Sequence, residues 1–593
     1  MSDPRIYRAA LIPVLFALVL LAFSLENRPR PLTTTLAPDA FAGDRAFDRA
    51  YEPGSGLAAR FPERRPGSIG DEQLADVVEA QFKQARGFRV RSTVHEGETI
   101  DGRRELRTVI AERTGTVDER IVVVAHRDAA GSPAEAELSG TAVLLELARV
   151  FGAPRQTQRT LTLVSTSGGS GGAAGAAALA EDLQGPFAGV LVLGDLASRN
   201  VRAPLLATWS NDLGATPQRL RRTLQEALRL EGSSARQPRA LSQFARFAMP
   251  ATYGEQGPLL ARGLPAVALS IGGDRPPAAG APISRARLEE LGRVALRTIT
   301  ALDTAPAGRP VSPQASSRDL VTSRKVLPGW GLRLFTGALL LAPLVVIVDA
   351  LAAVRRNREP VLPWLRWTLA CTLPIAVAAL FAIVLGAVGL LSATPGTPVS
   401  PQVLAPQLPA LLAVALVLVI AWVWLRPAIL RMMRCEGDPS APGAAVAVML
   451  MALVATVLVW IRNPYAAAAL IPALHVWLFA LAPDLRLRGG LRVALVALSI
   501  VPVVIVVATV ASSLGLSPTD TAWEALLVVA GGHASALSLL LWSVLGGCAA
   551  AAVMIAMRGG TPRGEDKRSI TMRGPRGYAG PGSLGGTQSA LRR

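Results

Sequence analysis

The chain divides near residue 330 into two parts with different hydrophobic patterns. In the first part short apolar runs alternate with amphipathic stretches, whereas long, almost uncharged apolar runs fill the second. A β-branched run such as Ile121–Ala125 is typical of a strand buried on both faces, and the apolar positions of Thr141–Phe151 recur at helical spacing. The pattern predicts an α/β domain, with a mostly parallel sheet flanked by helices, followed by an all-α polytopic transmembrane domain.

Strands and helices are expected to alternate along the α/β domain. We expect strands at Phe88–Val94, Arg104–Glu112, Ile121–Ala125, Thr160–Ser165, Gly189–Leu193 and Pro265–Ile271. We expect helices at Asp71–Arg86, at Thr141–Phe151, from the glycine-rich run Gly168–Gly175 to about Leu183, after Thr216-Pro217, and at Ser284–Leu302. Ser139 and Thr216 are the predicted N-caps of the second and fourth of these helices.

Long apolar runs predict membrane spans. The first, Ala9–Leu25, is followed by no small-residue cleavage site, which favours an uncleaved anchor over a cleaved signal peptide. Seven further spans are expected near Leu332–Val354, Leu365–Leu391, Leu408–Leu425, Ala444–Ile461, Ala466–Ala482, Val493–Leu514 and Ala534–Met557. The shorter run Ala522–Gly532 is expected to be a re-entrant or interfacial piece.

These patterns predict six regions along the chain. They are a membrane anchor (1–26), a Pro/Arg-rich linker with one short ordered piece (27–70), the α/β domain (71–303), a second linker (304–330), a seven-span transmembrane domain (331–557) and a basic disordered tail (558–593).

The arginines predict the orientation of the spans. Loops near Arg355, Arg431 and Arg488 are basic, as is the tail, whereas the alternate loop Ser392–Gln402 is uncharged. Because basic loops stay on the cytoplasmic side, we expect both termini in the cytoplasm. The expected location is a bacterial-type plasma membrane, with the α/β domain on its outer side.

Composition supports a membrane protein. The 593 residues are 51% hydrophobic and carry a net charge of +18, almost all from arginine. Since the arginines flank apolar runs, the expected partner is the lipid bilayer and not nucleic acid. The three cysteines, Cys371, Cys435 and Cys548, all lie in the apolar half, so the α/β domain can contain neither a disulfide nor a cysteine zinc site.

Candidate chemistry gathers at the end of the Ile121–Ala125 strand. His126 and Asp128 follow the strand directly, and Ser139-Gly140 then precedes a helix. Ligands collect at this edge of open α/β sheets. The order of these motifs resembles the co-catalytic zinc aminopeptidases of metallopeptidase family 28, over roughly Leu74–Leu302. The resemblance implies an aminopeptidase-like fold, a two-zinc site and peptide hydrolysis.

Most of the site that the resemblance implies is degenerate. His126 and Asp195 match two of the five metal ligands of the family, and Asp128 matches the residue that orients the histidine. The bridging aspartate, the glutamate base, its neighbouring ligand and the final histidine fall on Ala136, Gly169, Ser170 and Gln256, respectively. A catalytic zinc needs about three protein ligands and an open position.

Three nearby acids leave an altered metal site open. Glu135 and Glu137 flank the lost bridging position, and Glu255 lies beside the lost histidine, but Val164–Gly175 contains no acid to replace the base. The leading interpretation is therefore an inactive domain that binds a peptide or a partner membrane protein. One alternative is an active zinc aminopeptidase with an altered site, and only then is zinc the expected cofactor. Another is the receptor domain of a transporter-like protein.

Overall fold

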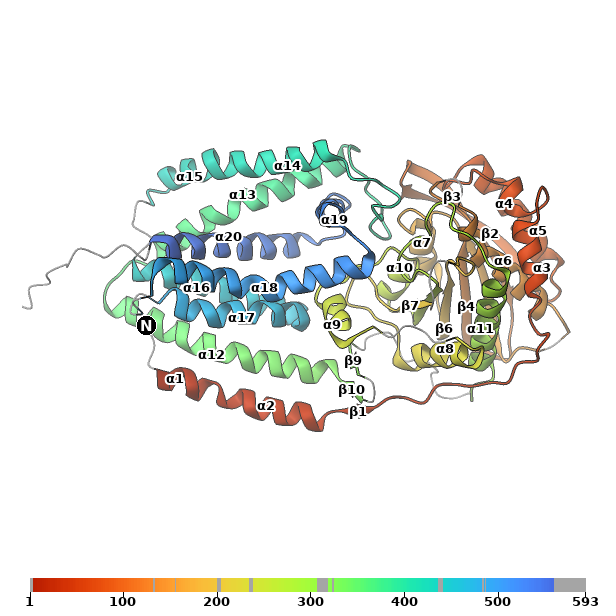
Figure 1. The fold of residues 1–593 in the computed structure, drawn as a ribbon, viewed down its shortest axis with the longest axis horizontal. Helices are drawn as coiled ribbons and strands as arrows, with labels where there is room; N and C mark the ends of the chain where they lie inside the picture. The colour runs from red at the N-terminus through yellow and green to blue at the C-terminus, as the bar shows by residue number, and fades with distance from the viewer. Residues whose placement is uncertain are drawn as a thin grey trace, which may run out of the picture.

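The computed structural model describes residues 4–131, 134–154, 156–199, 204–233, 238–306, 318–322, 325–435, 441–482, 485 and 487–558. An α/β domain lies at one end of the molecule and a bundle of long helices at the other (Figure 1). The predicted tail, 558–593, lies outside the described residues except for its first residue.

The α/β domain is built on one mixed sheet of seven strands. They are β2 (Arg89–Thr99), β3 (Gly102–Arg113), β4 (Val117–His126), β5 (Arg159–Thr166), β6 (Phe187–Leu193), β7 (Leu205–Ala207) and β8 (Ala266–Ser270), in the order β2-β3-β5-β4-β6-β8-β7. The central four, β5, β4, β6 and β8, are parallel, whereas β2, β3 and β7 pair antiparallel at the edges. The predicted fold class is confirmed, and only the short β7 was not predicted.

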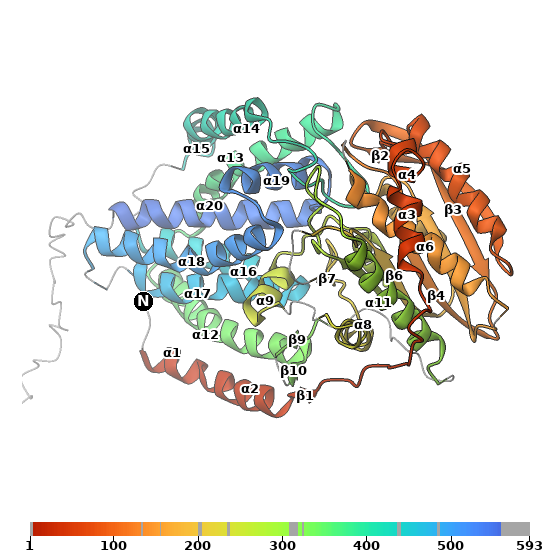
Figure 2. The same ribbon diagram turned by 45° about the vertical axis from the view of Figure 1, so that its right-hand side comes forward.

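The described part of the α/β half contains nine α-helices, most of which pack around this sheet. They are α3 (Gly43–Tyr51), α4 (Leu57–Arg60), α5 (Ile69–Gln84), α6 (Leu138–Phe151), α7 (Ala174–Asp182), α8 (Gln218–Leu230), α9 (Ala240–Ala248), α10 (Gln256–Ala261) and α11 (Arg285–Asp303). Figure 2 shows α6 and α11 together on one face. Of the nine, α3, α4, α9 and α10 were not predicted.

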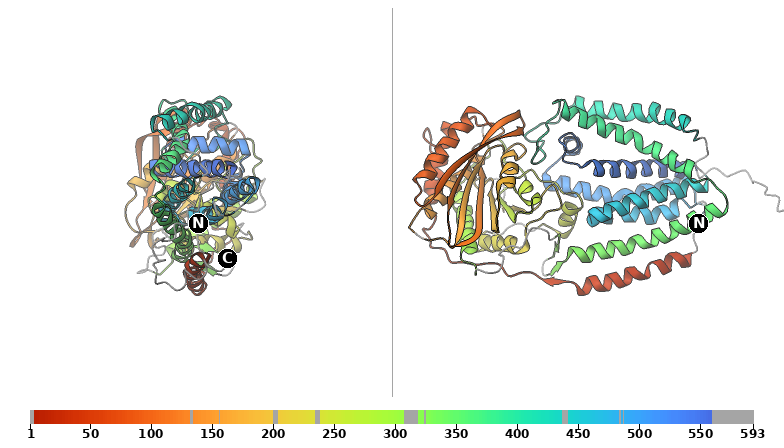
Figure 3. Two further views of the ribbon diagram at one scale, coloured as in Figure 1. Left: turned by 90° about the vertical axis from the view of Figure 1, so that its left-hand side faces the viewer. Right: turned by 180° about the vertical axis from the view of Figure 1, so that it is seen from behind.

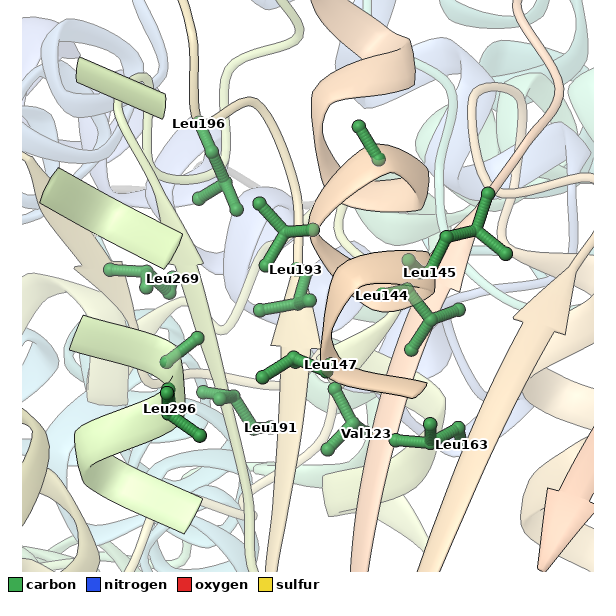
Figure 4. Packing of buried hydrophobic residues seen from close by; sticks show 14 of the residues in the cluster. Val123, Leu144, Leu145, Leu147, Leu163, Leu191, Leu193, Leu196, Leu269 and Leu296 are labelled. Atoms are coloured by element: carbon green, nitrogen blue, oxygen red, sulfur yellow. The ribbon is translucent and has the colours of Figure 1, made fainter. Parts of the chain in front are cut away.

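The main core lies between the sheet and α6. Leu144 and Leu147 of α6 point towards Val123 of β4, and these side chains belong to one buried cluster with Leu163 and Leu191 from the neighbouring strands (Figure 4). The alternate residues of β4 point to the opposite face and are also fully buried. The strand is thus buried on both faces, which explains its uninterrupted apolar run.

Two predicted helix starts were wrong. The helix α6 begins at Leu138, so Ser139 lies inside it and its hydroxyl donates to the carbonyl of Ala136 at 2.5 Å. The cap of α8 is Pro217, and Thr216 instead donates to the carbonyl of Ala266 at 2.6 Å. The Ser139 hydroxyl also accepts from the backbone N–H of Leu196 at 2.8 Å, so in both cases the hydroxyl contacts a distant segment that local sequence rules do not include.

Part of the segment expected to be a linker belongs to the α/β core. The helices α3 and α4 lie between residues 43 and 60, and the side chains of Phe41, Leu57 and Phe61 are buried in the main cluster. Arg64 is also buried and donates to the carbonyls of Arg127 and Ala134. This segment therefore contributes packing and backbone hydrogen bonds to the domain.

The second half is a helical bundle. Its elements are α1 (Pro4–Ala10), α2 (Ile12–Phe23), α12 (Gly329–Arg356), α13 (Leu362–Ala387), α14 (Leu408–Ile420), η2 (Ala421–Leu425), α15 (Arg426–Met432), α16 (Pro442–Arg462), α17 (Pro464–Ala480), α18 (Gly489–Leu514), α19 (Pro518–Ala530) and α20 (Ala536–Arg558). Seven helices within the described ranges are long and apolar enough to cross a membrane, one of them being the N-terminal Arg5–Phe23. The expected span at Ala466–Ala482 corresponds to α17, which is a shorter apolar helix.

One helix of the bundle runs across the others, and one histidine forms hydrogen bonds between helices. The helix α19 is seen end-on in Figure 1, while α18 and α20 lie in the plane of the picture, so α19 crosses the bundle direction near the α/β domain. In α17, His475 hydrogen-bonds across helices: its Nδ1 lies 2.8 Å from the Tyr7 hydroxyl and its Nε2 lies 3.2 Å from the carbonyl of Leu339. Figure 3 shows α2 running beside α12 along one side of the bundle.

The two halves are joined by packed contacts. A small sheet of β1 (Glu26–Asn27), β10 (Lys325–Leu327) and β9 (Leu320–Val321) gathers the two segments that connect them. Beside it, α9 packs on the bundle, and Asn463 donates to the carbonyl of Phe247 at 2.8 Å. Trp209 and Tyr465 are buried in the same cluster. This contact fixes the position of the α/β domain over the helix ends.

The packing of residues 41–64 predicts where an independent fragment must begin. A fragment with the domain bounds expected from the sequence, Asp71–Asp303, lacks Phe41, Leu57 and Phe61. Full burial of three large apolar side chains contributes roughly 5 kcal/mol. We expect a fragment of residues 32–306 to have a distinctly higher melting temperature, by circular dichroism, than Asp71–Asp303. Equal melting temperatures would show that the added helices do not stabilise the sheet.

Candidate functional site

His126 forms a buried ion pair at the end of β4. Its Nδ1 lies 3.5 Å from Oε2 of Glu255, and Thr166 donates to Oε1 of the same carboxylate at 2.5 Å. Burial alone would lower the pKa of His126, but the hydrogen bond and negative charge of Glu255 outweigh it and raise the pKa to about 9. The pairing with Glu255 therefore favours the protonated form of the imidazole.

The loop that replaces the expected base is fixed by Asp128. This carboxylate accepts hydrogen bonds from the backbone N–H groups of Gly169, at 2.9 Å, and Ser170, at 3.0 Å, and from the Ser170 hydroxyl at 2.5 Å. A Cβ atom on Gly169 would lie 2.3 Å from the Cβ of His126, too close for any side chain without movement. Asp128 therefore holds the glycine loop against His126, which differs from the orienting role that the resemblance implies.

Gln256, at the position of the lost histidine, is tied to a buried acid. Its Nε2 donates to the Thr252 hydroxyl at 2.7 Å and to Oδ1 of Asp274 at 3.0 Å. The other oxygen of Asp274 lies 3.0 Å from the guanidinium of Arg246, and both side chains are buried. The hydrogen bonds of Nε2 fix the orientation of the amide, whose Oε1 is buried without a hydrogen-bond partner.

Two buried carboxyls lie on another side of the site. Asp195, just beyond β6, accepts from the backbone N–H groups of Ala197 and Ser198, both at 3.0 Å, and burial raises its pKa. Glu137 lies in a single 3₁₀ turn (Glu135–Glu137), and burial raises its pKa to about 7, although the charge of His126 opposes the rise. The Oε2 atom of Glu137 is buried without a hydrogen-bond partner.

These side chains surround one cavity, which we call the strand-end cavity, of about 80 Å³. It is lined by His126, Glu137, Gly169, Ser170, Asp195, Tyr253, Glu255, Gln256, Asp274, Arg275, Pro276, Pro277, Pro398, Val399, Ser400 and Val403, among others. That volume is enough for several waters or for one small polar group with its neighbours. The structure thus brings together the sequence-predicted residues His126, Asp195, Gly169, Ser170 and Gln256.

Ala136 and Glu135 do not line the strand-end cavity. Ala136 is buried, and it lines a second cavity next to the first. Glu135 is exposed on the same turn. Of the acids considered for an altered metal site, Glu137 and Glu255 therefore reach the cavity and Glu135 does not.

Zinc does not fit the side chains as they are arranged. Over the residues that the structure describes, no three His, Cys, Asp or Glu side chains are placed to hold one metal ion. His126 is engaged by Glu255, and Asp195 by backbone N–H groups. No hydrolytic step through zinc follows from this arrangement.

Sequence reasoning missed several residues of the site. Arg246 and Tyr253 lie in or just beyond α9, which was not predicted. Asp274 follows the last predicted strand by a few residues, and its position after a strand end was a usable signal. The residues Pro398–Val403 come from the loop between α13 and α14, and no local pattern indicates that this loop reaches the cavity.

Comparisons with known proteins agree with the sequence resemblance. Residues 108–248 match the model of Peptidase family M28. This stretch runs from β3 to the end of α9 and includes His126 and Asp195. The predicted family resemblance is therefore confirmed for this part of the chain. No curated protein sequence matches it.

Several solved structures are similar to the α/β half. A glutaminyl cyclase of Porphyromonas gingivalis is 16% identical, with 44% of this chain and 99% of that chain covered and a TM-score of 0.32. The LapA aminopeptidase of Legionella pneumophila is 12% identical, with 46% and 76% covered and a TM-score of 0.36. The zinc aminopeptidase BSAP of Bacillus subtilis is 9% identical, with 46% and 98% covered and a TM-score of 0.32.

Proposed function

We propose that the α/β domain is an inactive, family-M28-like domain that binds the amino end of a peptide or of a partner membrane protein. The observation that carries the proposal is the pair of carboxyls, Glu137 and Asp195, at a cavity where the positions of hydrolytic chemistry are filled. Gly169 is packed on His126, and Gln256 is held by Asp274. The domain keeps a binding cavity without the groups that activate water.

A terminal ammonium group suits Glu137, one of several residues at this cavity that have a buried polar atom without a hydrogen-bond partner. Glu137 is 8% exposed, and its Oε2 has no hydrogen-bond partner. A buried acceptor without a partner is costly, so a cation that donates a hydrogen bond to it binds favourably. His126 and Arg246 already pair with Glu255 and Asp274, so these two acids are neutralised inside the protein.

Orientation is the second part of the proposal. The loop between α13 and α14 lines the strand-end cavity and contains no basic residue from 388 to 407. Arginines lie instead in the loops that follow α12 and α15, at the end of the bundle away from the α/β domain. This asymmetry supports an α/β domain outside the cytoplasmic membrane and both termini inside.

The first test asks whether Glu137 binds an amine. We expect Glu137→Gln to weaken binding of a free-amino tripeptide about 10- to 100-fold, the cost of losing a charge-assisted hydrogen bond. Glu135→Gln, on the same turn but exposed, is the matched control. Calorimetry on the full chain in detergent measures both. The amino-acetylated tripeptide should not bind, and equal binding of the two forms would contradict amine recognition.

The pH dependence of the same binding has a defined sign. Because the pKa of Glu137 is about 7, the carboxyl is neutral below pH 6 and charged above pH 8, while a peptide amine stays protonated up to about pH 7.7. We expect affinity to rise between pH 6 and 7.5 in the parent protein and to stay flat in Glu137→Gln.

The second test addresses hydrolysis. An active zinc aminopeptidase with an altered site is the competing proposal, favoured by the fact that His126, Glu137, Asp195 and Glu255 all line one cavity. We expect the purified full chain to contain far less than one zinc per chain. His126→Ala should match the parent on aminoacyl-arylamide substrates. Stoichiometric zinc, with a rate that collapses in His126→Ala, would establish the competing proposal instead.

The third test addresses orientation through native and introduced thiols. Cys435 follows α15 on the proposed cytoplasmic side, and Ser55 is exposed on the α/β domain. In intact cells a membrane-impermeant maleimide should label Ser55→Cys strongly and leave Cys435 unlabelled until the membrane is permeabilised. Cys435→Ser serves as the background control. Labelling of Cys435 in intact cells, with none of Ser55→Cys, would reverse the orientation.

A further inference from the structure

The loop between α13 and α14 belongs to the membrane half of the chain but is built into the α/β half. Thr397 donates its backbone N–H to the carbonyl of Gly172 at 2.8 Å and its hydroxyl to the carbonyl of Tyr253 at 3.1 Å. Within the loop, Thr394 donates to the carbonyl of Thr397 at 2.6 Å. Thr394, Thr397 and Val399 are all buried. The loop is therefore held in place by backbone as well as side-chain contacts.

Close backbone packing sets the distance between the two halves. A Cβ atom on Gly396 would lie 2.3 Å from the carbonyl oxygen of Gly172, and one on Gly172 would lie 2.4 Å from Cβ of Thr394. Only glycines permit this approach. As a result, the residues that follow Gly396 reach the rim of the strand-end cavity.

A second cavity of about 110 Å³ continues from the first. The two share Glu137, Pro276, Pro277 and Val403 as lining residues. We call the two adjoining cavities the cleft; prolines of the α/β domain and Val403 of the membrane half line both of its parts. Val403 is partly exposed, whereas Val399 is buried and lines the first cavity alone.

We propose that Val403, contributed by the membrane half, selects ligands by the size of the apolar group next to their amine. This inference rests on the proposed function, in which Glu137 binds the amine. Because Glu137 and Val403 line the same part of the cleft, an amine at Glu137 places the neighbouring side chain of a peptide beside Val403 and the two prolines. The preferred ligand then has a free amino end followed by an apolar side chain, and neither half of the protein forms the complete site alone.

The experiment compares two tripeptides, Leu-Ala-Ala and Gly-Ala-Ala, on the full chain in lipid nanodiscs. One methylene in an enclosed apolar pocket changes the ratio of affinities for two ligands by at least about tenfold. Val403 is partly exposed, so a smaller change is expected for each methyl group removed from it. We expect Val403→Ala to reduce the affinity for Leu-Ala-Ala about 5- to 10-fold and Val403→Trp to reduce it at least as much by filling the space. Both variants should bind Gly-Ala-Ala as the parent does, which also shows that they are folded.

Two further variants make the result specific. Val388→Ala makes the same chemical change at the other end of the loop, where the side chain is 62% exposed and outside the cleft, and should leave the ratio of the two affinities unchanged. Gly396→Val should displace the loop and abolish the preference for Leu-Ala-Ala while Val403 is still present.

The outcomes separate the two proposals. If the parent binds both tripeptides and the Val403 variants leave their ratio unchanged, this inference is wrong and the proposed amine binding stands. If the parent binds neither tripeptide, the proposed function fails and this inference fails with it. A ratio that changes equally in Val388→Ala would also overturn the role of Val403.

Discussion

The pairing of β4 with a parallel strand on each side is the constraint on which the rest of the domain depends. Where it is flanked by β5 and β6 and covered by helices on both faces, over Ile121–Ala125, this strand has no place for polar side chains. The first polar residues after Ala125 therefore lie at its carboxyl end, where the ends of β6 and β8 meet it. His126, Asp195 and the acids around them are concentrated there by topology, whatever chemistry they perform.

At this edge, the positions that lost the expected chemistry are not empty. Gly169 is closed against His126 and fixed by Asp128, and Gln256 is fixed by Asp274. His126 itself is neutralised by Glu255. Part of each side chain at these positions is satisfied by a neighbour, which is consistent with the proposal that the domain keeps the frame of a peptidase without its reacting groups. Several buried polar atoms around the cavity still lack a hydrogen-bond partner, among them Oε2 of Glu137 and Oε1 of Gln256. Of these, Glu137 is the carboxyl that no basic side chain pairs with among the described ion pairs, and this is the reason for proposing a ligand there.

The sequence predicted the parts of the fold that local patterns control. The apolar run of β4 and the periodicity of α6 were sufficient to place both elements, and the family resemblance placed His126 and Asp195 in one site. Local rules failed where a distant partner decides: the Ser139 hydroxyl accepts from the backbone N–H of Leu196, and Thr216 donates to the carbonyl of Ala266, instead of capping helices. They also could not find Val403, because nothing in a polar loop between two apolar helices records what it touches across more than a hundred residues of sequence.

The contact between Gly172 and Gly396 constrains how the two halves of the chain can evolve. A side chain at Gly396 would clash with the carbonyl of Gly172, and a side chain at Gly172 would clash with Thr394, so a change on one side of this contact requires a change on the other. A recombination event that exchanged the membrane half for that of a distant relative would preserve the sheet and its core. It would nevertheless separate two surfaces that fit only each other, and the two halves are therefore expected to descend as a single unit.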